Sequence, residues 1–181
     1  MFPPRHVVLK DGSQVLIRTG TEADAEAIQK CVLAYVEDGE GQLWARGEFH
    51  PTVEEERVWI KGITNHPDEL LLVAEHDGEI IGNIDLHVGR RVKLAHTGEF
   101  GMSCMPNWRG LGLGTFLIAQ LLKWARENQH LEKVNLRVLG SNTRGIALYK
   151  KMGFHEEGRR KKEVKQAPGV YDDEIFMGIF V

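Results

Sequence analysis

The sequence has 181 residues, of which 42% are hydrophobic and 27% are charged, so it does not belong to the disordered, collagen-like or coiled-coil classes. The length suits one domain, residues 1–181, with a single buried core. A net charge of −3 provides no overall attraction to nucleic acid or to an anionic membrane, so binding must depend on a local site.

Strand and helix patterns alternate from the beginning of the chain. A short apolar run over 15–18 predicts a strand, and Thr21 can cap a helix whose apolar residues recur at helical spacing over 27–35. Thr52, followed three residues later by Glu55, is the capping-box pattern and predicts the start of a second, shorter helix.

Three strand patterns follow and predict an antiparallel meander. Residues 70–75 and 80–88 are separated by an Asp-Gly pair, which is a strong hairpin signal because both positions tolerate positive φ. Residues 96–104 predict a third strand, and Pro106 ends it because proline has no N–H for the ladder.

The second half of the chain continues the alternation. Residues 117–125 carry an apolar stripe at i, i+4 and i+8 and predict the longest helix, packed against a sheet. Apolar and polar residues alternate over 134–138, which predicts a strand, and residues 142–152 predict a short helix that ends at Gly153. Strands and helices in this order predict an α/β fold with one mixed sheet covered by helices.

The carboxyl-terminal residues predict a hairpin around a turn at 167–169. Its first strand, 157–165, carries a basic run that suits a solvent-exposed sheet edge, with RNA contact as the alternative. Its second strand, 175–181, is apolar on both faces, so we expect it to be buried centrally in the sheet.

A glycine-rich turn starts at Arg109, between a strand end and a helix start. Backbone N–H groups and the helix dipole can converge there on an anion such as a phosphate. The turn is not a dinucleotide fingerprint, because Thr115 stands where the third glycine is needed, and no Gly-Lys-Ser/Thr makes it a P-loop. The glycines alone also suit a purely structural role, in which strand and helix approach closely.

The turn and a later segment together resemble a known family. The spacing of these residues is similar to that in the GCN5-related N-acetyltransferases (GNAT), in particular the branches that acetylate small amines and ribosomal-protein amino termini. The specific motifs lie within 96–154, and the order of elements agrees over nearly all the rest. The resemblance implies a mixed, mostly antiparallel, twisted sheet with helices on both faces. The motif residues are Cys104, Met105, Pro106, Arg109, Gly112, Gly114, Asn142 and the run 147–154.

The resemblance implies acetyl-CoA as the co-substrate and an N-acetyltransferase that moves the acetyl group to a primary amine by direct attack through a tetrahedral intermediate. The turn would bind the pyrophosphate, and the backbone of the preceding strand would hold the pantetheine arm and the thioester carbonyl. Cys104 would act through its amide while its side chain packs in the core, and Asn142 would bind the arm, cap its helix, or do both. The implied acetyl-CoA-binding residues are Met102, Ser103, Cys104, Arg109, Gly110, Leu111, Gly112, Leu113, Gly114, Thr115 and Asn142.

Tyr149 and Glu99 are the candidate catalytic residues. Tyr149 matches the family tyrosine near the thioester sulfur, and a phenol can give its proton to the departing thiolate; a core aromatic is the alternative. Glu99 matches a frequent family position for a base that acts directly or through water, and a structural or substrate-binding role is the alternative. Some members carry a glutamate on the next strand, where this chain has Arg137, which argues against their mechanism and against protein amino termini as substrates.

The acceptor is expected to be a small amine with positive charge. Residues 22–56 contain ten Asp/Glu against two Lys/Arg, which favours a cation held by Glu37, Asp38 and Glu40; a solvated acidic face is the alternative. A non-catalytic acyl-CoA-binding module on the same fold is the alternative function. The sequence leaves open which amine is accepted and whether the chain is a monomer or a homodimer.

No metal, nucleic-acid or membrane site is predicted. Cys31 and Cys104 have no CxxC partner, and the eight histidines show no metal-ligand spacing. Apolar runs stay far short of the roughly 18 residues of a membrane span, and the amino terminus has no apolar signal core. We therefore expect a soluble protein in the reducing cytoplasm.

Overall fold

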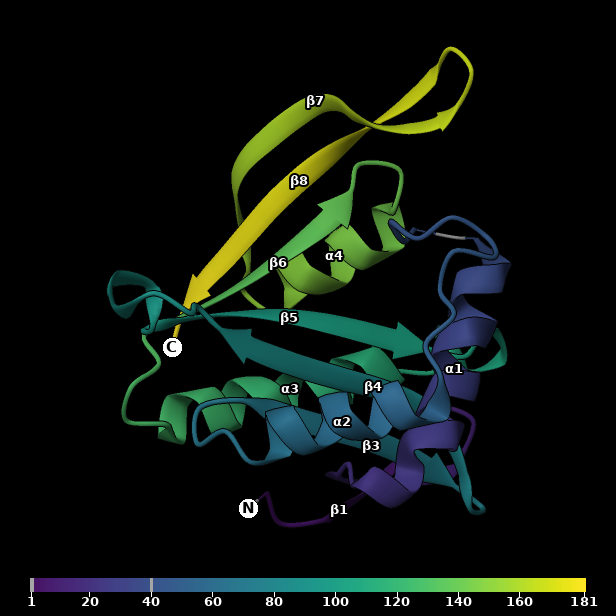
Figure 1. Ribbon diagram of the computed structural model, residues 1–181, viewed down its shortest axis with the longest axis vertical. Coiled ribbons are helices and arrows are strands. Elements are labelled where there is room, and N and C mark those ends of the chain that lie inside the picture. Colours follow the sequence, from purple (N-terminus) through teal and green to yellow (C-terminus); the bar gives the residue numbers. More distant parts are fainter. Residues whose placement is uncertain (1, 40) are drawn as a thin grey trace.

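The computed structural model describes residues 2–39 and 41–181. Within them, eight strands form one sheet in the order β1-β2-β3-β4-β5-β6-β8-β7 (Figure 1). Neighbouring strands are antiparallel except for β5 and β6, which are parallel, so the predicted mixed, mostly antiparallel sheet is confirmed. The strands are β1 (Arg5–Val8), β2 (Gln14–Thr19), β3 (Leu70–His76), β4 (Glu79–Val88), β5 (Thr97–Cys104), β6 (Lys133–Leu139), β7 (His155–Ala167) and β8 (Val170–Phe180).

Helices cover both faces of the sheet, as predicted (Figure 1). Alternate residues of β3 point to opposite faces, so Leu70 and Leu72 join one core cluster while Leu71 and Val73 join the other. The first cluster includes α3 and has α4 packed against it, and the second lies under α1 and α2. The α-helices are α1 (Ala25–Asp38), α2 (Val53–Thr64), α3 (Leu113–Glu127) and α4 (Thr143–Lys151), with short 3-10 turns at Glu22–Asp24, Val92–Leu94 and Pro106–Trp108.

Local signals start and join these elements as predicted. The Thr52 hydroxyl accepts from the Glu55 N–H at 3.2 Å, and the Glu55 carboxylate accepts from the Thr52 N–H at 2.7 Å. Asp77 and Gly78 have φ values of 48° and 80° in the β3–β4 turn. The same Asp-Gly signal, with Gly12 at φ 90°, joins β1 to β2, although the sequence analysis did not predict β1.

The position of the last strand differs from the prediction. β8 lies between β6 and β7, one strand from the edge of the sheet, and not at its centre. β6 ends at Leu139 opposite Glu174, so the start of β8 pairs with β7 alone, and this hairpin extends beyond the rest of the sheet (Figure 1). At the other end, Phe180 is 76% exposed. β7 is the predicted exposed basic edge.

β5 and β6 pair only where they begin. The parallel register joins Thr97–Glu99 to Lys133–Asn135, and beyond this register the two strands diverge (Figure 1). Among the described residues, the second half of β5 therefore has no partner strand on its β6 side. No helix of the described residues is long and apolar enough to cross a membrane.

Candidate active site

Two cavities meet where β5 and β6 part. The smaller, of about 330 Å³, is lined by the glycine-rich turn, and the larger, of about 720 Å³, lies between β4, β5, β6 and the residues of α1 and α2. Four residues line both cavities, and we call them the junction residues: Tyr35, Met102, Asn142 and Tyr149. A molecule bound in one cavity can therefore reach a molecule bound in the other.

The glycine-rich turn forms the amino-terminal end of α3. Gly110 and Gly112 have φ values of 79° and 98°, and the latter is the residue that precedes the helix. The first N–H groups of a helix have no partner within it, and here they lie beside the smaller cavity. Leu113 lines this cavity with its side chain in the core, whereas Leu111 lies outside it and accepts a hydrogen bond from the Lys10 N–H at 3.1 Å.

Arg109 also lines the smaller cavity. Its guanidinium forms an ion pair with Asp38 of α1 and lies over the ring of Tyr35, 5.6 Å from the centroid. Asp38 thus contacts this turn and does not line the larger cavity, which contradicts its predicted role in holding the acceptor. Glu37 is also outside that cavity and accepts from the Gly47 N–H at 3.1 Å, while Glu40 lies outside the described residues.

β5 supplies residues to both cavities, most of them to the larger one. Cys104 lines the smaller cavity, Ser103 lines the larger one, and Met102 reaches both. Burial raises the pKa of the Cys104 thiol to about 12, so the thiol stays protonated and acts by packing. Gly114 lets α3 approach this strand closely, because an added Cβ would lie 3.3 Å from the Met102 Cε atom.

Asn142 stands at the start of α4. Its Oδ1 atom accepts from the Gly145 N–H at 2.8 Å, which confirms the predicted cap. Its Nδ2 group donates to the Gly41 carbonyl at 3.1 Å, so the segment after α1 is attached to the junction of the two cavities.

Tyr149 projects from α4 toward the same junction. It packs edge-on against Phe100 and Phe154, with ring centroids 5.9 and 6.2 Å away. Burial raises the pKa of the Tyr149 phenol well above its ordinary value of 10, so the hydroxyl keeps its proton at neutral pH.

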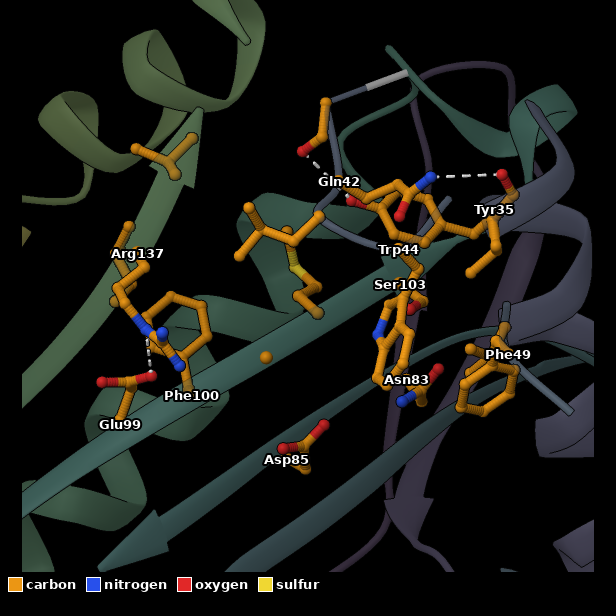
Figure 2. Close-up of a pocket in the computed structure, with 18 of the residues that line it drawn as sticks. Tyr35, Gln42, Trp44, Phe49, Asn83, Asp85, Glu99, Phe100, Ser103 and Arg137 are labelled. Atoms are coloured by element: carbon orange, nitrogen blue, oxygen red, sulfur yellow. Dashed lines mark hydrogen bonds and ion pairs between the residues drawn. The ribbon is translucent and has the colours of Figure 1, made fainter. Parts of the chain in front are cut away.

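Glu99 lines the larger cavity on its β6 side (Figure 2). Its Oε1 atom accepts from the Nε group of Arg137 at 2.8 Å, and Arg137 also faces Glu174, with Nη1 and Oε1 3.5 Å apart. The Glu99 charge is therefore balanced by Arg137 of the next strand.

Several residues of the larger cavity were not predicted from the sequence. On β4, Asn83, Asp85 and His87 line it from alternate positions, a polar stripe of period two that the sequence contains. Burial raises the pKa of the Asp85 carboxyl to about 6. Aromatic residues also line the cavity, among them Trp44, Phe49 and Trp59.

The described residues contain no group of three or more His, Cys, Asp or Glu side chains placed to hold a metal ion. The chemistry that the two cavities can support is group transfer between two bound organic molecules. The turn suits an anionic cofactor, and the larger cavity, which is apolar and partly acidic, suits the second molecule.

Comparisons with known proteins agree with this geometry. L-amino acid N-acetyltransferase AaaT of Escherichia coli (strain K12) is 27% identical over 91% of this chain and 97% of the relative. Spermidine N(1)-acetyltransferase of the same strain is 30% identical over 77% of this chain and 73% of the relative. A crystal structure of a GNAT-family acetyltransferase from Streptococcus pneumoniae has a TM-score of 0.87 at 23% identity and covers 92% of this chain and 99% of that one.

The family model for the acetyltransferase (GNAT) family matches residues 35–154. This range contains the strands that part, the glycine-rich turn and all four junction residues. Since the match covers more than half of the sequence, the chain belongs to the acetyltransferase (GNAT) family.

Proposed function

We propose that this acetyltransferase transfers the acetyl group of acetyl-CoA directly to a small primary amine, through a tetrahedral intermediate. The observation that carries the proposal is the meeting of the two cavities at the junction residues. One cavity is suited to a pyrophosphate and the other to a small organic acceptor. Residues 1–181 act as one catalytic domain, because a single sheet carries both cavities.

In this proposal, acetyl-CoA binds in the smaller cavity. The unpaired N–H groups at the start of α3 hold its pyrophosphate, and Gly112 leaves open space for the phosphate oxygens. The pantetheine arm follows β5 past Cys104 to Met102, with Asn142 beside it. A backbone N–H of β5 stabilises the negative charge on the carbonyl oxygen in the tetrahedral intermediate.

Tyr149 is the proposed general acid. The reaction breaks the C–S bond, so the departing thiolate needs a proton, and a phenol held neutral at the junction can supply it. The half-buried position of Tyr149 at the junction supports this role, because the same residue borders both the cofactor cavity and the acceptor cavity.

Glu99 is the proposed general base, directly or through a water molecule. A primary amine with a pKa of about 10.4 is almost fully protonated at pH 7, so deprotonation costs about 5 kcal/mol before the amine can attack. Glu99 lines the acceptor cavity, and Arg137 keeps its carboxylate oriented there.

Tyr149→Phe tests the proposal most directly. Removing the hydroxyl should lower kcat about 100-fold while the KM for acetyl-CoA stays within a few fold, because the acid acts only in the transition state. Thiol release with a panel of primary amines measures both constants. The control is Tyr171→Phe, which removes a hydroxyl from an exposed tyrosine of the β7–β8 hairpin.

An unchanged kcat in a folded Tyr149→Phe protein, with chemistry rate-limiting, would remove Tyr149 from the mechanism. Binding of acetyl-CoA without thiol release for any amine would instead favour a non-catalytic acyl-CoA-binding module.

A further inference from the structure

The acidic residues of the larger cavity differ in how their charges are compensated. Four carboxylates line it. Glu55 is held by the amino-terminal cap of α2, and Glu99 by Arg137. Among the described residues no Arg or Lys pairs with the other two: Glu56 has no hydrogen bond or ion pair, and Asp85 faces only the Gly101 backbone N–H and the His87 ring, so both can accept a hydrogen bond from a ligand.

Glu56 and Asp85 repel each other across the cavity. Glu56 is only 6% exposed, and among the described residues no hydrogen bond or ion pair reaches its carboxylate. Burial raises the pKa of Glu56, and the negative charge of Asp85 raises it further. Two carboxylates of this kind, one buried and one half-buried, are costly when both are ionised, and a bound cation between them would offset that cost.

His87 does not serve as that cation for both carboxylates. Its Nε2 atom lies within ion-pair distance of Asp85, 3.6 Å from Oδ2, and its Nδ1 atom faces Glu69 Oε2 at 3.1 Å. Among the described residues, neither ring nitrogen contacts Glu56. Arg90 pairs with the same Glu69 carboxylate, with Nη2 and Oε1 3.0 Å apart, so the positive charge of this arginine lies at Glu69 and not at Glu56.

The side-chain oxygen of Asn83, which lines the same cavity, has no hydrogen-bond partner among the described residues. Asn83 is 3% exposed, and its Oδ1 atom is buried without a hydrogen bond from any described residue. Asn83 and Asp85 stand two positions apart on β4 and point to the same side, into the cavity (Figure 2). Together with Glu56, they offer three acceptor groups, which equals the three N–H donors of a primary ammonium group.

These three residues stand apart from the reacting centre. The junction residues lie on α1, β5 and α4, whereas the three acceptors lie on β4 and α2, on the far side of β5 from β6. Adjacent strands are about 4.7 to 4.9 Å apart, so a group bound there is several atoms away from an amine that reacts at the junction. Trp59, on α2, lines the same cavity and adds an aromatic face, which attracts cations.

We propose that Glu56, Asn83 and Asp85 form a subsite for a second ammonium group of the acceptor, so that the preferred acceptor is a short aliphatic diamine. The inference rests on the proposed acetyl transfer and names its substrate class. An α-amino acid is disfavoured, because its carboxylate would approach Glu56 and Asp85, and Arg137 is already bound to Glu99.

The test compares acceptors that differ only in the distal group: 1,4-diaminobutane, butylamine and 4-aminobutanoate. Thiol release should give a kcat/KM for the diamine at least 10-fold above that for butylamine, and 4-aminobutanoate should be the poorest. In Glu56→Gln and Asp85→Asn, the ratio of diamine to butylamine should fall about 10- to 100-fold, because a charge-assisted hydrogen bond is lost.

Glu54→Gln is the matched control, since Glu54 lies on the same helix, is 74% exposed and pairs with Arg57 outside the cavity. It should leave the ratio unchanged. Equal use of diamine and butylamine by the wild type, or an unchanged ratio in both subsite variants, overturns the subsite while acetyl transfer stands.

If no amine releases thiol, the proposed reaction fails, and binding then tests the subsite by itself. Thermal shift should still show stabilisation by 1,4-diaminobutane that exceeds the shift with butylamine and that Glu56→Gln removes. Equal shifts with both amines would overturn the subsite as well.

Discussion

Glu99 and Asp85 are two carboxylates of the larger cavity with different surroundings. Glu99 lies on β5 beside Arg137, whereas Asp85 lies half-buried on β4 with its pKa raised to about 6 by desolvation. In the proposed mechanism Glu99 takes the proton of the reacting amine, and Asp85 binds the other end of the acceptor.

The role of Glu99 can be tested by a pH profile. In the wild type, ionisation of the base contributes an acidic limb to kcat/KM, and Glu99→Gln should remove that contribution. The variant's kcat/KM should then rise with pH only as the free amine loses its own proton. Thiol release between pH 5 and 10 measures the profile, with Glu157→Gln, an exposed partner of Lys133, as the control. A limb that stays in Glu99→Gln would exclude this residue as the base.

Asp85 should lower the stability of the folded protein at neutral pH. Its pKa is about 6 in the fold against an ordinary value of 3.8, so the folded state binds more protons than the unfolded state between these values. The Asp85 carboxyl therefore makes its full contribution to stability below about pH 4, and this contribution is lost as the pH rises through 6. Asp85→Asn should raise the free energy of unfolding by about 2 to 3 kcal/mol at pH 8, and by almost nothing at pH 4.

Urea unfolding of both proteins at pH 4, 6 and 8 measures this difference. Asp77→Asn, at a 91% exposed position of the β3–β4 turn, is the control and should show no comparable pH dependence. A gain for Asp85→Asn that is equal at all three pH values would contradict the assigned pKa.

At the scale of elements, the amino-terminal end of α3 is expected to be the main contact for the cofactor. Gly112→Asp would place a carboxylate among the N–H groups that are proposed to hold the pyrophosphate, and should abolish binding of acetyl-CoA. In the wild type, acetyl-CoA at 100 times its Kd should stabilise by about 2.7 kcal/mol, a shift in Tm of roughly 5 to 10 °C. Thermal unfolding with and without acetyl-CoA or desulfo-CoA measures this.

Gly112→Asp also strains the backbone, because position 112 has a positive φ of 98°. The control variant must therefore carry the same strain. Gly169→Asp does so, because Gly169 has φ 79° and no neighbour within 4 Å of an added Cβ, as at Gly112, but lies in the turn between β7 and β8. It should lower the Tm of the free protein while the shift with acetyl-CoA stays intact. A normal shift in folded Gly112→Asp would show that this turn does not hold the cofactor.

At the scale of the whole molecule, this acetyl-CoA-dependent N-acetyltransferase has two adjoining cavities in one sheet, where β5 and β6 stop pairing. β5 supplies residues to both cavities, and Asn142 and Tyr149 line the junction from α4 and its cap. The Arg109–Asp38 pair and the Asn142–Gly41 hydrogen bond join α1 and its following segment to the turn and to α4. In the proposed function, these contacts link the cofactor side to the acceptor side.

The sequence by itself determined the local features of this protein. Helix caps, Asp-Gly turns, the stripe of α3 and the glycine-rich turn depend on residues a few positions apart, so their patterns are readable before folding. The family motif can likewise be recognised in the sequence before the structure is known. The missed β1 carried the same Asp-Gly signal as the hairpin that was predicted.

Only the tertiary structure decided which distant residues meet. The pairing of β6 with β8, and the brief parallel contact of β5 with β6, set where the sheet opens, and no local pattern encodes that order. The acidic segment is an example. Helix packing places Asp38 in an ion pair with Arg109, and it places Glu56 close enough to Asp85 for the two charges to repel each other. Charge composition predicted a negative acceptor wall, but the particular carboxylates depended on contacts between residues far apart in the chain.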